Sequence, residues 1–212
     1  MGPDVDKLFL EVAGAPVVAH TWKRFDAAGF DEIILVVREG LQEAFTTLAA
    51  SLALQTPWRL VPGGRERQDS VWNGLSAVRP ETQWVAIQDG ARPCTSLEII
   101  RNCRAAAERT GASVAAQPAV DTMKESADGR CISRHLDRTK LWAVQTPQCF
   151  RLEVIRQALT VVRQRGLNVT DDTTACDYIG QAVELVPGSA PNPKVTSPTD
   201  LPWIDYLLRS QA

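Results

Sequence analysis

The sequence has few of the residues that build metal clusters and disulfide frameworks. It contains two histidines, His20 and His135, which leaves little material for histidine catalysis or a histidine metal site, so both are expected to be structural. Its five cysteines are odd in number and none has CxxC spacing, which argues against a disulfide framework and against a zinc cluster. We therefore expect reduced cysteines, as in cytoplasmic proteins.

Long apolar runs and an excess of basic residues are also missing. No run approaches the roughly 20 apolar residues of a membrane-spanning helix, so no membrane partner is expected. The net charge of −2 offers no basic surface for a nucleic acid. The first five residues are acidic rather than basic and then apolar, so no signal peptide is visible and a cytoplasmic location is predicted.

What the sequence does contain is a regular alternation of strand and helix patterns. Its 212 residues, 44 % hydrophobic and 23 % charged, suffice for one domain with a buried core, spanning residues 1–212. This alternation predicts an α/β fold with a Rossmann-like, doubly wound, mostly parallel sheet. Strands are predicted at 32–37, 58–61, 84–88, 112–116 and 182–186, and helices at 16–28, 41–52, 70–78, 97–109, 152–164, 173–179 and after 199.

The alternation breaks between about residues 119 and 146. Short extended segments are predicted at 120–124, 130–136 and 142–145, and Asp128-Gly129 is a strong hairpin-turn signal between the first two. A hairpin that projects from an α/β domain needs a surface to pack against. We therefore predict a projecting β-hairpin arm whose partner is a second subunit.

The segment Asp89-Gly90-Ala91-Arg92-Pro93 follows a predicted strand, where ligands of such folds bind. A carboxylate there can hold a hard cation beside a phosphate, and small residues let the backbone approach the ligand. Arg92 can bind phosphate oxygens bidentately. The same pattern also fits a strand-to-helix turn with a surface ion pair, and spacing alone leaves both interpretations open.

Two further segments give weaker evidence of a binding site when each is taken alone. Residues 62–70 place two glycines, arginines and a serine before a helix, which can form an anion site. An ordinary turn with Asp69 or Ser70 as the helix N-cap is the favoured interpretation of this segment. Lys194 lies in a predicted short strand at 192–196, where it either points at a bound phosphate or is solvated surface.

Six stretches taken together resemble one known family. They follow in the order GGRERQDSV, DGARP, DTMK, LWAVQTPQCF, TDDTTA and PKVTSPTDL. This order is similar to that of the 2-C-methyl-D-erythritol 4-phosphate cytidylyltransferases, and the similarity extends from Lys7 to the C-terminal helix. The resemblance implies transfer of CMP from CTP to that sugar-alcohol phosphate, giving 4-diphosphocytidyl-2-C-methyl-D-erythritol and pyrophosphate. It also implies Mg²⁺ as cofactor and a homodimer that shares its active sites through the hairpin arm.

The resemblance implies roles for individual residues. Asp89 is implied as the Mg²⁺ ligand, and Lys7, Arg138 and Lys194 as catalytic cations. Nucleotide binding is implied for Gly64, Arg67, Ser70 and Gly90. Substrate binding is implied for Arg92, Thr122, Arg138, Thr146, Thr170 and Lys194, of which Thr122 and Arg138 lie on the arm and would reach the neighbouring subunit.

The family pattern begins with a strand and a glycine-rich loop of the type GxGxRM, ahead of the position that Lys7 matches. Met1-Gly2 stand where that loop would end, so we expect unpaired strand edges inside the sheet. Three explanations stay open: Met1 is an internal methionine of the loop, upstream residues are absent from the sequence, or the protein is an inactive, dimeric, sugar-phosphate-binding paralogue. The presence of Lys7, Asp89, Arg138 and Lys194 favours the first two.

A ribitol-5-phosphate cytidylyltransferase is an alternative to the methylerythritol phosphate enzyme. Enzymes of that kind share the fold and the nucleotide site, and differ in the pocket for the sugar phosphate. The residues alone do not separate the two substrates.

Overall fold

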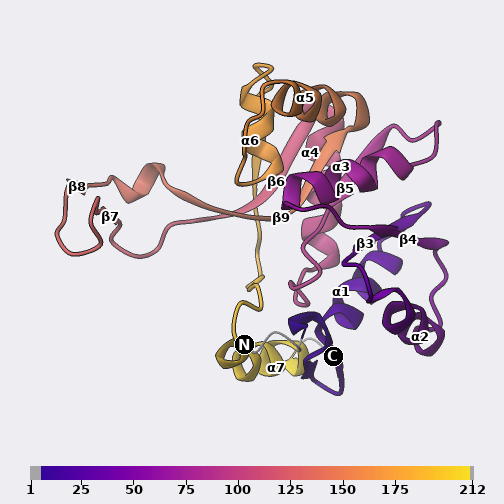
Figure 1. Ribbon diagram of the computed structural model, residues 1–212. Helices are drawn as coiled ribbons and strands as arrows, with labels where there is room; N and C mark the ends of the chain where they lie inside the picture. The colour runs from indigo at the N-terminus through magenta and orange to yellow at the C-terminus, as the bar shows by residue number, and fades with distance from the viewer. Residues whose placement is uncertain (1–5, 211–212) are drawn as a thin grey trace.

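The computed structural model in Figure 1 describes residues 6–210, and the predicted Met1-Gly2 match lies outside the described residues. The strands are β1 (Glu11–Val12), β2 (Ala15–Pro16), β3 (Ile33–Val37), β4 (Trp58–Pro62), β5 (Trp84–Ile87), β6 (Ala112–Pro118), β7 (Lys124–Glu125), β8 (Arg134–His135), β9 (Trp142–Arg151) and β10 (Glu184–Pro187). The α-helices are α1 (Val17–Asp26), α2 (Gln42–Leu52), α3 (Arg67–Ala77), α4 (Leu97–Thr110), α5 (Leu152–Gln164), α6 (Asp172–Asp177) and α7 (Leu201–Ser210). Short 3₁₀ helices are η1 (Lys7–Phe9), η2 (Arg138–Lys140) and η3 (Pro198–Asp200).

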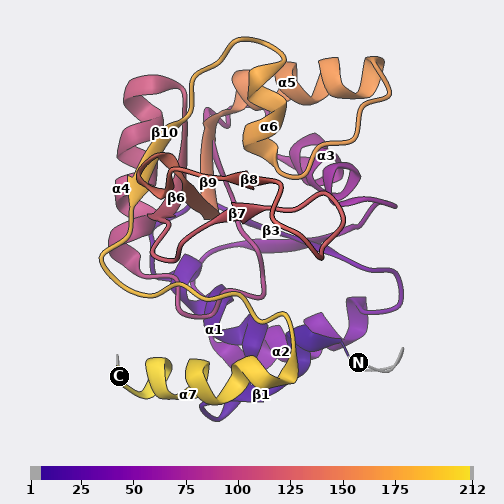
Figure 2. The ribbon, with the colours of Figure 1, turned by 90° about the vertical axis from the view of Figure 1, so that its left-hand side faces the viewer.

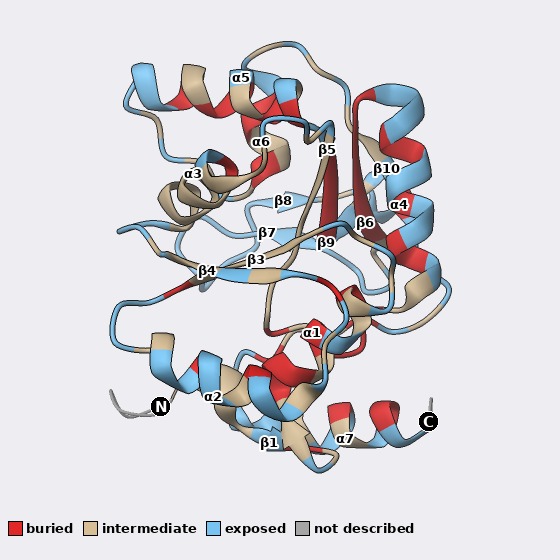
Figure 3. Ribbon diagram, turned by 90° about the vertical axis from the view of Figure 1, so that its right-hand side faces the viewer, coloured by how far each residue is buried: buried red, intermediate tan, exposed pale blue. Residues whose placement is uncertain are grey.

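A four-stranded mixed sheet in the order β10–β6–β9–β5 forms the larger half of the protein. β10 and β6 run parallel, whereas β9 runs antiparallel to both β6 and β5. α4 packs on one face through Cys103 and Ala107, and α3, α5 and α6 surround Phe150 on the other face, as Figure 3 shows by burial. Helices on both faces of the sheet confirm the predicted α/β fold.

The parallel pair β3–β4 forms a second, smaller sheet. α1 and α2 pack on it through Trp22 and Phe45, and Trp22 meets Trp58 of β4 edge to face with ring centroids 5.3 Å apart. α7 lies beyond α1 and packs Ile204 against Val17. None of the helices within residues 6–210 has the length and apolarity that a bilayer crossing requires.

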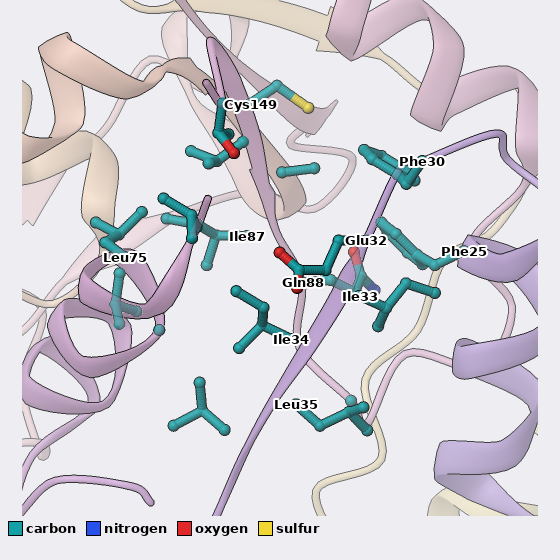
Figure 4. A pocket seen from close by; sticks show the side chains of 18 of the residues that line it. Phe25, Phe30, Glu32, Ile33, Ile34, Leu35, Leu75, Ile87, Gln88 and Cys149 are labelled. Atoms are coloured by element: carbon teal, nitrogen blue, oxygen red, sulfur yellow. The ribbon is translucent and has the colours of Figure 1, made fainter. Parts of the chain in front are cut away.

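β3 and β5 face each other across a cavity. Each has one edge that no strand among residues 6–210 pairs with. The cavity has a volume of about 840 Å³ and is lined by both strands and by the helices above and below them (Figure 4).

The hairpin arm extends away from the sheets as the continuation of β6 and β9 (Figures 1 and 2). Its paired part, β7 with β8, is shorter than predicted, whereas β9 runs on to Arg151 and joins the central sheet. Asp128 turns the chain at the tip, because its carboxylate accepts hydrogen bonds from the backbone N–H groups of Arg130 and Cys131, each 2.9 Å long. Gly129, with φ +69°, supplies the left-handed backbone that the predicted turn requires.

Two local predictions were wrong. α3 begins at Arg67 rather than Ser70, because Glu66 is the N-cap and Asp69 closes a capping box with it, so neither Asp69 nor Ser70 caps the helix. The segment around Lys194 forms no strand in the part of the chain that the structure describes. It is instead held by the side-chain contacts of the site.

Candidate active site

Asp89 lies just beyond the carboxyl end of β5 and is surrounded by three cationic side chains. Its Oδ2 is 3.0 Å from Lys194 Nζ and 3.4 Å from Arg92 Nε, and its Oδ1 is 3.9 Å from Arg67 Nε. Burial acts to raise the pKa of Asp89, but the hydrogen bond and charge of Lys194, with Arg67 and Arg92, hold that pKa below its ordinary value. Asp89 is therefore an ionised carboxylate at neutral pH.

Arg92 ties the Lys194 segment to the turn after β5. Its side chain is only 11 % exposed, and its Nη1 donates a 2.7 Å hydrogen bond to the carbonyl oxygen of Asn192. The Asn192 side chain is buried and accepts a 3.0 Å hydrogen bond from Thr95, while Val195 N donates to Ala91 O at 2.8 Å. These contacts bring Lys194 to Asp89, 105 residues earlier in the chain, without a strand.

Gly64 and Ser70 shape the loop before α3. The backbone N–H of Gly64 donates a 3.0 Å hydrogen bond to Ser70 Oγ. A Cβ atom on Gly64 would lie 2.3 Å from the Cβ of Asp69, so only glycine fits this close approach. Arg67 and Ser70 line the same cavity as Asp89 and Gly90, and Gly64 joins them through its hydrogen bond to Ser70.

Thr146 adds a hydroxyl next to Asp89. Its Oγ1 accepts a 3.1 Å hydrogen bond from Asp89 N, and its carbonyl oxygen accepts a 2.9 Å bond from Asn192 Nδ2. The Thr146 side chain is buried, so it positions the Asp89 backbone. Thr170 is exposed in the loop before α6, where its hydroxyl lies 3.4 Å from that of Thr174.

Asp172 is a buried member of the site to which sequence reasoning assigned no role. Its Oδ2 accepts a 2.7 Å hydrogen bond from Arg67 Nη1, while its buried Oδ1 has no hydrogen-bond partner among residues 6–210. Burial raises the pKa of Asp172 above its ordinary value, against the opposing charge of Arg67. Asp171 is the N-cap of α6, and Asp172 is the buried first residue of the helix. Acids are common in the first turn of a helix, so the TDDTTA stretch carries no local signal of this role.

The structure does not bring every predicted residue to Asp89. Lys7 is half-buried in η1, next to Leu8, whose side chain lies against Gly90. Thr122 and Arg138 are exposed on the arm, which extends away from the body of the same chain (Figure 1). There Arg138 Nη1 donates a 2.6 Å hydrogen bond to Val120 O.

Comparison with known proteins identifies the family. The family model for 2-C-methyl-D-erythritol 4-phosphate cytidylyltransferase (IspD) matches residues 1–210. The chain belongs to this cytidylyltransferase family. It is 39 % identical over 209 residues to the cytidylyltransferase of Bacillus velezensis, covering 98 % of this chain and 89 % of that protein. Its identity to the Pelotomaculum thermopropionicum relative is 38 % over 213 residues, covering 100 % and 90 %.

Solved structures of cytidylyltransferase family members have the same fold. The 4-diphosphocytidyl-2C-methyl-D-erythritol synthase of Anaerococcus prevotii superposes with a TM-score of 0.88 at 27 % identity, covering 95 % of this chain and 93 % of that one. The 2-C-methyl-D-erythritol 4-phosphate cytidylyltransferase of Thermus thermophilus superposes with a TM-score of 0.81 at 30 % identity, covering 96 % of this chain and 93 % of that one. The protein is thus a nucleotidyltransferase of the cytidylyltransferase family, with the fold that its motifs predict.

The side chains around Asp89 suit a magnesium ion that is also bound by substrate phosphates. Within residues 6–210 no group of three or more His, Cys, Asp or Glu side chains could enclose a metal ion. Magnesium usually keeps several waters and binds through one or two carboxylates together with substrate phosphates. The single ionised carboxylate of Asp89 suits an ion that arrives with a triphosphate.

Proposed function

We propose that this protein transfers the cytidylyl group of CTP to 2-C-methyl-D-erythritol 4-phosphate and releases pyrophosphate. Membership of the family supports the reaction, and the observation that carries the assignment of the site is the cluster of Lys194, Arg92 and Arg67 around Asp89. Such a cluster suits two polyanionic substrates that must approach each other.

In the proposed reaction a phosphate oxygen of the sugar-alcohol phosphate attacks the α-phosphorus of CTP. A new P–O bond forms there as the bond from the α-phosphorus to the bridging oxygen breaks, and pyrophosphate leaves with that electron pair. Charge builds on the oxygens of the α-phosphate, so positioned cations provide most of the catalysis. We assign Lys194 and Arg67, which lie beside Asp89, to this role, together with Lys7. No protein nucleophile is needed.

Binding of the nucleotide is assigned to the loop before α3 and to the turn after β5. Arg67, Ser70 and Gly90 line the cavity, and Gly64 N–H is hydrogen-bonded to Ser70 Oγ. Backbone N–H groups at the start of a helix, here α3, favour anions. Arg92, Thr146, Thr170 and Lys194 are assigned to the sugar phosphate. Mg²⁺ is assigned to Asp89, and when bound it would neutralise the triphosphate.

Thr122 and Arg138 are assigned to the active site of a partner subunit. The arm exposes several apolar side chains to solvent, with Val120 80 %, Ile132 58 % and Met123 42 % exposed. Apolar exposure of this kind, on a segment without a core of its own, is typical of an interface. We infer a homodimer in which the arm of each subunit reaches the crevice of the other.

Pyrophosphate release tests the proposed function directly. The purified protein is incubated with CTP and Mg²⁺ and with either 2-C-methyl-D-erythritol 4-phosphate or ribitol 5-phosphate. Turnover with the methylerythritol phosphate is expected. Turnover only with ribitol 5-phosphate would assign the alternative substrate, and CTP binding without turnover of either would identify a binding protein.

A further inference from the structure

The loop between α5 and α6, residues 165–171, carries Thr170 on a segment that the core holds in place. The loop passes beside α3 on its way to α6 (Figures 2 and 3). Leu167 and Val169 pack against the apolar cluster around Phe150, whereas Thr170 itself is exposed. We call residues 165–171 the α5–α6 loop.

Gln68 of α3 binds the backbone of the α5–α6 loop with both polar atoms of its side-chain amide. Its Nε2 donates a 3.1 Å hydrogen bond to the carbonyl oxygen of Leu167, and its Oε1 accepts a 3.0 Å bond from the N–H of Val169. These partners fix the orientation of the amide, because a carbonyl oxygen can only accept and an N–H can only donate. The residue before Thr170 is thus tied to α3.

Gln148 of β9 holds the residue after Thr170. Its side chain is only 2 % exposed. Its Nε2 donates a 3.0 Å hydrogen bond to Asp171 Oδ2, and its Oε1 accepts a 3.2 Å bond from Asp172 N. Burial of an amide is costly unless its hydrogen bonds are made, and these partners satisfy it. Thr170 therefore lies between two residues that glutamines hold from opposite sides.

The two glutamines differ in what else they hold. Gln148 also bonds the backbone of Asp172, whose carboxylate binds Arg67, so a change at Gln148 would reach the residues assigned to the nucleotide. Both side-chain hydrogen bonds of Gln68 go to the α5–α6 loop. Gln68 is therefore the residue whose loss would disturb Thr170 selectively.

We propose that Gln68 is a positioning residue for the sugar-alcohol phosphate, because it holds Val169 and thereby the hydroxyl of Thr170. This inference rests on the proposed function, in which Thr170 binds that phosphate. A hydroxyl hydrogen bond weakens steeply when its distance or angle is wrong, so the backbone beneath Thr170 has to be fixed. The start of α3 then serves both substrates, the nucleotide through Arg67 and the sugar phosphate through Gln68.

The variant Gln68→Met tests this role, because it keeps the length of the side chain and its suitability for a helix but removes both hydrogen bonds. We expect the KM for the sugar-alcohol phosphate to rise about tenfold, while kcat and the KM for CTP change less than about twofold. An equal rise of both KM values, or no rise in either, would overturn the proposal.

Gln181→Met is the matched control. Gln181, in the turn after α6, also makes two hydrogen bonds to the backbone, to the carbonyl oxygens of Thr110 and Ala182. The control should leave kcat and both KM values at those of the wild type. A rise in the KM for the sugar phosphate as large as that of Gln68→Met would show a general effect of loosened loops and would contradict a specific role.

A double-mutant cycle with Thr170→Val asks whether Gln68 acts through Thr170. If it does, the double variant should have the same KM for the sugar phosphate as Thr170→Val alone, because the hydroxyl that Gln68 positions is already gone. Independent effects would multiply instead, and that result would overturn the proposal.

Hydrogen exchange of the ligand-free protein separates failure of this proposal from failure of the proposed function. Residues 167–171 should exchange several-fold faster in Gln68→Met than in the wild type, while β9 stays unchanged. Unchanged exchange at Val169 would overturn the role of Gln68 even in a fully active enzyme. Faster exchange in a protein whose wild type turns over neither sugar phosphate would instead contradict the proposed function, and with it the substrate role of Gln68, but not the contact.

Discussion

Arg67 and Asp172 form a 2.7 Å ion pair that points the Arg67 guanidinium across the crevice, so that its Nε lies 3.9 Å from Asp89 Oδ1. The Asp172 side chain is fully buried at the start of α6, whereas that of Arg67 is about a third exposed. The buried acid is therefore the fixed end of the pair, and the arginine is the end that can reach a ligand.

Substitution Asp172→Asn should reduce kcat/KM for CTP by about 10- to 100-fold, because a hydrogen bond to a charged group contributes about 1.5–3 kcal/mol. Asparagine keeps the volume but removes the charge that orients Arg67. Steady-state kinetics at varied CTP measures this, with Asp177→Asn, an exposed acid at the other end of α6, as the matched control. Equal losses in both variants, or a loss explained by unfolding in thermal melts, would contradict a positioning role for Asp172.

The loop before α3 offers a matched pair of glycines. A Cβ on Gly64 would lie 2.3 Å from Asp69 Cβ, whereas a Cβ on Gly63 meets its nearest atoms at 3.4 Å, an ordinary contact. Gly64→Ala should therefore shift the capping box of α3 and raise the KM for CTP about tenfold or more, at a cost of about 1–3 kcal/mol in stability. Gly63→Ala should leave both the KM for CTP and the stability close to those of the wild type. Similar behaviour of the two variants would show that the close approach is unimportant.

Asp89→Asn tests the assignment of the metal. The variant keeps the size of the side chain but loses the ionised carboxylate that Mg²⁺ requires. The Mg²⁺ concentration for half-maximal turnover should rise at least tenfold, while thermal melting confirms that the fold persists. Unchanged Mg²⁺ dependence would assign the metal elsewhere.

Shared active sites can be tested by mixing Asp89→Asn and Arg138→Ala at a Mg²⁺ concentration too low for turnover by Asp89→Asn. In a mixed dimer, one site combines the intact Asp89 of one subunit with the intact Arg138 of the other. Random exchange makes half of the dimers mixed, with one of two sites intact, so about one quarter of wild-type activity should return. Unmixed variants should stay inactive. No recovery after subunit exchange, verified by mass, would place Arg138 in the site of its own subunit.

Asp200 anchors the segment that carries Lys194. Its carboxylate accepts hydrogen bonds from Thr196 N and Ser197 N, both 2.8 Å long, and these lower its pKa to about 2. A depressed pKa in the folded state stabilises the fold above the unfolded value near 3.8, and this contribution is lost as pH falls towards 2. The stability difference between wild type and Asp200→Asn, from urea unfolding, should therefore be constant above about pH 5 and shrink below pH 4. A difference that stays constant down to pH 2 would contradict this.

Much of the site could be predicted from local sequence, because most of its residues lie in turns at the ends of strands and helices. Asp89-Gly90-Ala91-Arg92 directly follows β5, and Gly64, Arg67 and Ser70 surround the start of α3, as their residue types predict. The N-cap was missed because Glu66 is a less common cap than the serine and aspartate beside it. Asn192, in a loop, and Asp172, at the start of α6, were missed because their roles depend on burial, which the type of a single polar residue does not reveal.

The sequence by itself determined the α/β alternation, the hairpin turn and the family, since each rests on short-range patterns of side-chain type. Only the tertiary structure decided that Lys194 meets Asp89, because that contact depends on Arg92 and Asn192 closing a long connection. It also decided that β3 and β5 line one cavity from opposite sides, and that the arm carries Arg138 away from the body of its own chain. These are relations between distant segments, and their energies arise from packing and pairing that no local pattern encodes.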